Sequence, residues 1–155
     1  MIVRNGGAPD AAALAELREI EPDQLAAYTA WVAAHAATHL PFVAEVDGCV
    51  VGCVVGCAWL HVAERVPASG SLDRRYGDVQ SVMVRPEHRN RGIGAALMAA
   101  VLAEARVRGL SHVTVHSGRR AVDFYVRNGF SHHRRLLLWE PTGSSAAVAD
   151  QGEGE

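Results

Sequence analysis

The sequence predicts a single α/β domain, with about six strands in one sheet and about four helices around it. Three observations favour this fold class. The 155-residue chain is 49% hydrophobic, which is enough apolar material for one compact core. Segments with the two-residue period of strands are interleaved with segments of helical period. A strand, a Gly-rich turn and a long Ala-rich helix follow one another between residues 78 and 108.

The first half of the chain is predicted to contain three strands and two helices. Residues 2–5 suit a short strand, and Asp10 can cap a helix that Pro22 stops. A second helix is predicted to start at Asp23, with an apolar side formed by Tyr28, Trp31 and Val32. The dipeptide Asp47-Gly48 separates two β-rich runs and favours a hairpin with a tight two-residue turn. A polar loop without apolar period is expected at residues 64–77.

The three cysteines fall four residues apart in the second run of this hairpin, as Cys49, Cys53 and Cys57. Residues at this spacing lie about 13 Å apart in a strand, too far for a disulfide or a shared metal ion. We therefore expect small buried thiols in a reducing compartment.

The second half begins with the strand 78–84, which Pro86 stops. Residues 92–108 then predict a helix with one apolar stripe, formed by Ile93, Leu97, Val101 and Ala105. The remaining elements are expected to be a strand at 111–116, a helix at 119–128 that ends at Gly129, and a last strand at 130–140. We assign residues 1–140 to one domain and expect the acidic, small-residue tail 141–155 to be disordered.

Composition excludes several classes of partner. The formal net charge is −2 and the sequence pI about 6.4, so nothing favours nucleic acid or an anionic membrane as partner. No apolar run reaches the roughly 18 residues of a membrane helix, and the N-terminus lacks the order of a signal peptide. A cytoplasmic protein is therefore expected. All fifteen basic residues are arginine, which, with the abundance of Ala and Gly, indicates high-GC bacterial coding.

The Gly-rich turn "RNRGIGA", residues 89–95, predicts an anion site. A strand, a proline and this turn place backbone N–H groups at a helix N-terminus, where they lack intrahelical partners and the helix dipole favours negative charge. Gly92 and Gly94 would let a phosphate approach the backbone, and Arg89 and Arg91 add positive charge. The chain has no Lys for a Walker loop, and Leu97 stands where a dinucleotide fingerprint needs its third glycine. A pyrophosphate site of another kind is therefore predicted.

Two motifs resemble those of the GNAT superfamily of N-acetyltransferases. The run "VMVRPEHRNRGIGAALM" is similar to the acyl-CoA-binding motif, in which Arg89, Gly92 and Gly94 fill the pattern Arg-x-x-Gly-x-Gly. About thirty residues downstream, "AVDFYVRNGF" is similar to the Ala-x-x-x-Tyr…Gly-Phe helix and turn of the same family. The order of the predicted elements from residue 1 to about 140 is also consistent with this family.

The resemblance implies a GNAT fold, a central mixed and mostly antiparallel sheet that is splayed at the CoA-binding strand. It implies an acyltransferase that moves an acetyl, or another short acyl, group from acetyl-CoA to a primary amine by direct attack in a ternary complex, without a metal. Tyr125 takes the position of the general acid that protonates the leaving thiolate. The residues expected to bind acetyl-CoA are Val82, Met83, Val84, Arg89, Asn90, Arg91, Gly92, Ile93, Gly94, Ala95 and Ser117.

Several questions stay open at this level. Gly118 stands where many relatives have an Asn that contacts the cofactor, which favours an alternative function, an acyl-CoA-binding regulatory or degenerate module without turnover. Candidate general bases are Glu45, His61, Glu64 and Asp78. The acidic residues near the expected cleft favour a cationic small-molecule acceptor; they are Glu45, Glu64, Asp73 and Asp78.

Other polar and aromatic residues have simpler alternatives. His35 and His39, four apart on an expected helix, could bind a metal ion, but no third ligand is evident. The run from His132 to Arg135 is expected to be solvated, and Tyr28 and Trp31 to be core residues or acceptor-pocket residues. The apolar run Leu136–Trp139 is compatible with a homodimer that exchanges a strand.

Overall fold

The computed structural model describes residues 1–47 and 53–141. Three short 3-10 turns accompany the main elements, at Ala8–Asp10, Pro22–Gln24 and Pro86–His88. The described helices and strands are, in chain order, β1 (Ile2–Asn5), α1 (Ala11–Leu17), α2 (Leu25–Ala34), β2 (His39–Val46), β3 (Cys53–Arg65), β4 (Arg74–Val84), α3 (Ile93–Val107), β5 (Val113–Val115) and α4 (Val122–Arg127).

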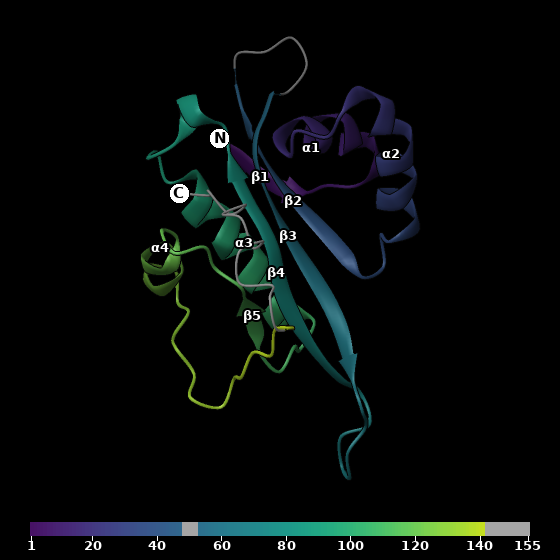
Figure 1. Ribbon diagram of the computed structural model, residues 1–155, viewed down its shortest axis with the longest axis vertical. Coiled ribbons are helices and arrows are strands. Elements are labelled where there is room, and N and C mark those ends of the chain that lie inside the picture. The colour runs from purple at the N-terminus through teal and green to yellow at the C-terminus, as the bar shows by residue number, and fades with distance from the viewer. Residues whose placement is uncertain (48–52, 142–155) are drawn as a thin grey trace.

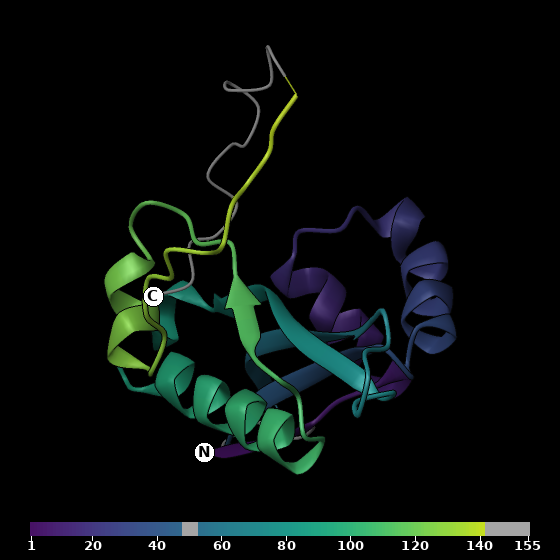
Figure 2. The same ribbon diagram turned by 90° about the horizontal axis from the view of Figure 1, so that it is seen from below.

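The strands form one sheet in the order β1-β2-β3-β4-β5. The first four are antiparallel to their neighbours, and β5 runs parallel to β4. Helices α3 and α4 cover one face of this sheet, and α1 and α2 cover the other (Figures 1 and 2). The expected mixed and mostly antiparallel α/β architecture is thus confirmed.

Strands β4 and β5 separate soon after they meet. Their ladder joins only Gly77–Val79 to Val113–Val115, whereas β4 continues to Val84. A β-bulge lies at this point, because Trp59 pairs with Ser81 but Leu60 with Val79, which leaves Gln80 as an extra residue in β4. The bulge brings Val79 into the same buried cluster as Val82, although simple alternation places these two on opposite faces. The expected splay of the sheet therefore begins at the bulge.

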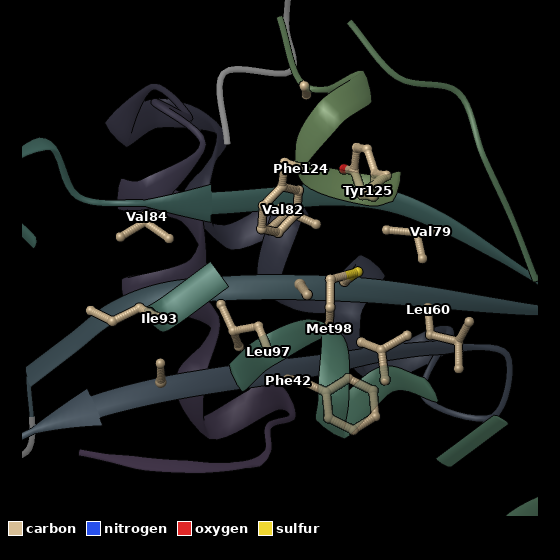
Figure 3. Packing of buried hydrophobic residues seen from close by; sticks show 14 of the residues in the cluster. Phe42, Leu60, Val79, Val82, Val84, Ile93, Leu97, Met98, Phe124 and Tyr125 are labelled. Carbon is tan, nitrogen blue, oxygen red and sulfur yellow. The ribbon is translucent and has the colours of Figure 1, made fainter. Parts of the chain in front are cut away.

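Two hydrophobic clusters fill the two faces. The larger cluster packs α3 and α4 on the sheet, and Leu97, Met98 and Val101 of α3 are fully buried in it (Figure 3). The predicted stripe of α3 is confirmed in full, since its four residues are all buried. The smaller cluster packs α1 and α2 on the other face through Leu14, Leu17, Val32, Val43, Val54, Cys57 and Trp59. Each face of β4 therefore has its own core and its own covering helices.

Two predicted connections and one predicted strand differ from the structure. The register joins Val46 to Cys53, whereas a two-residue turn at Asp47-Gly48 would pair Val46 with Cys49. The expected polar loop 64–77 is shorter, because β3 extends to Arg65 and β4 begins at Arg74, which leaves residues 66–73 between them. Residues 130–140 form no strand, and the described sheet has five strands, in rough agreement with the expected number of about six. The predicted tail from residue 142 onward lies outside the described residues.

The cysteine prediction is also wrong in part. Cys57 is a buried free thiol, as expected. Cys53, however, is disulfide-bonded. The argument against a disulfide assumed that all three cysteines lie in one extended strand, and the described part of β3 contains only Cys53 and Cys57. Cys49 lies outside the described residues.

Gly56 of β3 lies where both β4 and α3 approach the strand too closely for a larger residue. A Cβ at this position would lie 2.9 Å from the Met83 carbonyl oxygen and 3.2 Å from Cγ2 of Ile93. We expect Gly56→Ala to lower the free energy of unfolding by about 1–3 kcal/mol, because the backbone oxygen cannot yield as a side chain can. Urea denaturation measures this. Gly7→Ala is the control: its Cβ would meet only Pro9 at 3.7 Å, so equal losses in the two variants would refute the prediction.

Candidate active site

The N-terminus of α3 is an open and uncapped helix end. Its N-cap residue, Gly92, has a φ of 78°, and no side chain caps the first turn. Asn90 also has a positive φ, 59°. A Cβ on Gly92 would meet no atom of the described residues within 4 Å, so this part of the chain leaves open space beside the turn. The first N–H groups of a 15-residue helix therefore face open space, an arrangement that suits an anion.

The other residues of the turn take different positions. Arg89 donates a hydrogen bond from Nε to the Val84 carbonyl oxygen at 3.1 Å, which ties the turn to the end of β4. Arg91 and Ala95 are exposed, whereas Ile93 and Gly94 are buried against the sheet. Ile93 and Gly94 can thus contribute only backbone groups to a ligand, and Arg91 can contribute its side chain.

The end of β4 has one edge without a ladder. Val82, Met83 and Val84 pair with Ala58, Cys57 and Gly56 of β3, but β5 pairs only as far as Val79. The Val82 and Val84 side chains are buried on the α3–α4 face, and Met83 packs against the cluster of the opposite face. The backbone groups on the open edge of these residues can therefore pair with an extended, amide-bearing ligand.

Tyr125 lies on α4 above β4. Its ring contacts Phe124 and Phe130 edge to face, and in Figure 3 its hydroxyl points toward Val82. The residue is buried, and burial raises the pKa of its hydroxyl above the usual value. Within the described residues the hydroxyl has no hydrogen-bond partner. It can therefore donate a proton or a hydrogen bond to a ligand at the splay.

A cavity of about 870 Å³ opens on the α4 side of β5, and Val115, Ser117 and Tyr125 are among its lining residues. The Ser117 hydroxyl donates to the Gly118 carbonyl oxygen at 2.8 Å, so its own hydrogen is already used within the turn. Only its oxygen lone pairs remain for a ligand.

A second cavity, of about 590 Å³, lies on the α1–α2 side of the same strands. Trp59, Asp78, Gln80 and His116 line it, together with Arg18, Ile20, Tyr28, Trp31, His39, Val79 and Ser81. His116 lies between Val115 and Ser117 in sequence, yet it lines this cavity while both of its neighbours line the first. Both cavities thus reach the chain at the end of β5 from opposite faces, but no residue of β4 and none of residues 85–95 lines the first cavity.

Comparison with known proteins agrees with this geometry. The model of the acetyltransferase (GNAT) family matches residues 10–130. The chain belongs to the GNAT family. Over 64 residues it is 31% identical to a glucosamine 6-phosphate N-acetyltransferase of Trypanosoma brucei brucei. That match covers 41% of this chain, and the chain spans only 44% of the length of this curated relative.

Solved structures share the GNAT fold along most of their length. An acetyltransferase of Trypanosoma brucei has a TM-score of 0.72 at 24% identity, over 90% of this chain and 99% of its own. A predicted acetyltransferase of Clostridium acetobutylicum, solved with acetyl-CoA, has a TM-score of 0.71 at 18% identity, over 90% and 95% of the two chains. The expected GNAT fold is thus confirmed.

The structure separates the candidate bases of this GNAT domain. Glu45 accepts a hydrogen bond from Arg4 Nε at 3.1 Å, at the β1 end of the sheet, and Glu64 is exposed on the β3–β4 ribbon. Asp78 lines the second cavity and accepts a hydrogen bond from the Thr114 hydroxyl at 2.7 Å. His61 pairs with Asp78 in the strand register. Only Asp78 and its neighbour His61 therefore remain close to the splay.

Sequence reasoning missed part of the second cavity in this GNAT domain. Of its lining residues, Tyr28, Trp31 and Asp78 were candidates from the sequence, whereas Arg18, His39, Trp59 and His116 were not assigned to a pocket. His39 begins β2 and stacks on His61, with ring centroids 4.3 Å apart, so it does not share a helix with His35. The only available signal was strand register, which local periodicity does not reveal.

No group of three or more His, Cys, Asp or Glu side chains within residues 1–47 and 53–141 of this GNAT chain is arranged to hold a metal ion. The helices of the same residues are all too short or too polar to cross a membrane. The run from His132 to Arg135 is exposed, in agreement with solvated side chains.

Proposed function

We propose that this chain transfers an acetyl, or another short acyl, group from acetyl-CoA to a primary amine of a small molecule. The observation that carries this proposal is that the separation of β4 from β5 leaves an open strand edge next to the uncapped N-terminus of α3, with a cavity on the α1–α2 side of the same strands. Such an arrangement lets a donor and an acceptor be bound at the same time, so that the amine attacks the thioester directly in a ternary complex.

The donor side has three parts that suit acetyl-CoA. The open N-terminus of α3 takes the pyrophosphate, through the backbone of residues 90–95 and the Arg91 side chain. Arg89 holds this turn on β4 by its bond to Val84. The free edge of Val82–Val84 pairs with the amides of the pantetheine arm, and Ser117 offers its oxygen from across the splay. The thioester then lies in the gap between the two strands.

The chemistry needs no covalent enzyme intermediate. The neutral amine forms a C–N bond to the thioester carbonyl, and a backbone N–H of β4 stabilises the oxyanion of the tetrahedral intermediate. The C–S bond then breaks, and Tyr125 gives its proton to the leaving thiolate. The proton of the amine leaves on the side of Asp78, the acidic residue nearest the splay. Amide and CoA are the products.

Two measurements test this proposal. Calorimetry with acetyl-CoA tests the donor site, and absence of binding at tens of micromolar would contradict the proposal as a whole. A thiol-release assay across a panel of small primary amines then tests turnover. A protein that binds acetyl-CoA but releases no CoA with any amine would instead be a regulatory or degenerate module, the function that Gly118 favours.

We also propose a homodimer built from the segment after α4. Leu137 and Trp139 are 87% and 82% exposed in a segment that leads away from the sheet (Figure 2), and β5 is an edge strand of the described sheet. An exposed apolar run and a free strand edge together favour pairing with a second copy.

The dimer is tested by light scattering of the full chain at micromolar concentration. Wild type is expected to be a dimer, and the double change L137E with W139E is expected to give a monomer, because two buried charges would oppose the interface. Leu72→Glu is the control, since Leu72 is 79% exposed on the distant β3–β4 loop and should leave the dimer intact. A monomeric wild type would contradict the proposal.

A further inference from the structure

Two buried polar atoms without partners belong to residues that line the same cavity. The Tyr28 hydroxyl and the Trp59 indole Nε1 are both buried and have no hydrogen-bond partner within the described residues. Both residues line the cavity on the α1–α2 side, one from α2 and one from β3. Buried donors are nearly always satisfied in folded proteins, because an unmade hydrogen bond is costly. Two such donors beside one cavity indicate a ligand with oxygen acceptors.

Arg18 adds a positive charge to these two donors. It follows α1 directly as its C-cap and lines the same cavity. Within the described residues its guanidinium makes no ion pair and no hydrogen bond. Burial raises the pKa values of Tyr28 and Cys57, and the charge of Arg18 opposes the rise at both. Arg18 and Tyr28 therefore bring a positive charge and a hydroxyl to the helical side of the cavity.

The acidic group of the cavity lies further along the same strand. Cys57, Trp59 and His61 occupy one face of β3, and Asp78 is the register partner of His61. Arg18 therefore reaches the cavity from the end of α1, and Asp78 reaches it from β4, next to the splay. Of the four acidic residues that favoured a cationic acceptor, only Asp78 lines this cavity.

A molecule that fits this cavity needs opposite charges at its two ends. A primary ammonium is attracted by the Asp78 carboxylate, close to the place where β4 and β5 separate. A guanidinium together with a phenol O–H and an indole N–H is a donor set for an oxyanion, since arginine binds carboxylates and phosphates through paired hydrogen bonds. A purely cationic amine would leave all three donors without partners.

We propose that the acceptor is a primary amine that also carries a carboxylate or a phosphate, and that Arg18, Tyr28 and Trp59 bind this oxyanion. The inference rests on the proposed function, because it assigns the acceptor of that same reaction. It restricts the acceptor to a class of small molecules with the amine and the acidic group at opposite ends.

Matched pairs of amines test the inference. One pair is an amino acid with a terminal amine and its carboxamide, and the other is an amino alcohol and its phosphate monoester. Thiol release at saturating acetyl-CoA gives kcat/KM for each member. Wild type is expected to prefer the acidic member of at least one pair by about 10- to 100-fold, and the preferred pair identifies the oxyanion.

Arg18→Met is expected to remove this preference, mainly through a higher KM for the acidic member, so that kcat/KM becomes similar for the two members of the pair. Arg18→Lys, which keeps the charge, should retain part of the preference. Arg74→Met is the matched control, because within the described residues the Arg74 guanidinium bonds only to the Val66 carbonyl oxygen, at the far end of the β3–β4 ribbon. Calorimetry with acetyl-CoA shows that each variant is folded and keeps its donor site.

The outcomes separate this inference from the proposed function. If wild type acetylates both members of each pair equally well, the inference is wrong and the proposed function stands. If the preference exists but survives in Arg18→Met, the assignment of Arg18 is wrong. If no amine of any kind releases thiol, the proposed function itself fails.

Discussion

Replacement of Gly92 by aspartate is expected to weaken acetyl-CoA binding by about 100-fold or more, because a carboxylate would face the pyrophosphate at close range. The change fills the open space in front of α3, where a Cβ meets no atom within 4 Å. Aspartate is a favourable residue at a helix N-cap, which partly offsets the strain of a φ of 78°. Calorimetry should therefore report a large loss of affinity with a small change in Tm.

Gly70 provides the matched control for this change. It has a φ of 76° and also has no atom within 4 Å of an added Cβ, but it lies in the loop between β3 and β4. Gly70→Asp introduces the same charge and similar backbone strain without a helix N-terminus. Acetyl-CoA binding of Gly70→Asp should match wild type, and equal affinities for both variants would place the pyrophosphate elsewhere.

Tyr125→Phe is expected to lower kcat by about 10²- to 10⁴-fold, the usual contribution of a general acid. The dissociation constant for acetyl-CoA should stay unchanged, because the ring and its contacts remain. No partner within the described residues loses a hydrogen bond, so the free energy of unfolding should be unchanged or slightly higher. Thiol-release kinetics and urea denaturation measure the two effects separately.

The pH dependence of the same reaction follows from the burial of Tyr125. A general acid must be protonated, and burial raises the pKa of this hydroxyl above its usual value near 10. Loss of activity through ionisation of Tyr125 should therefore begin only above about pH 10. Tyr76→Phe is the control, since Tyr76 stacks on His112 away from the splay. Equal rates in Tyr125→Phe and Tyr76→Phe would assign the acid to another group.

The strand end and turn proposed as the donor site could be predicted as local structure from the sequence, because their elements are consecutive. The end of β4, the proline, the Gly-rich turn and α3 are consecutive, so residues 82–95 carry their own boundaries in Pro86, Gly92 and the apolar stripe. The helix that carries Tyr125 ends at Gly129, whose φ of 99° explains the glycine that the sequence shows there. Both motifs need only neighbouring residues to form.

The acceptor half could not be predicted in the same way, because long-range pairing builds it. Arg18, Trp59 and His116 come from three distant elements, and only the register of β3 and β4 brings them to one cavity. The bulge at Gln80 also changes which side chains of β4 face each core, which a two-residue period cannot show. The predictions for the connection before Cys53 and for a strand after α4 were wrong for a related reason. Composition alone does not reveal whether a segment has another strand to pair with.

The bulge at Gln80 divides β4 into two segments with different proposed roles. Residues 78–81 line the cavity assigned to the acceptor, and the next three residues carry the edge assigned to the donor. Under the proposed function, substitutions before Val82 should therefore change the acceptor preference, and substitutions after it should change the affinity for acetyl-CoA. To change which amine is acetylated, a redesign would therefore replace only Arg18 and the residues of β4 before Val82.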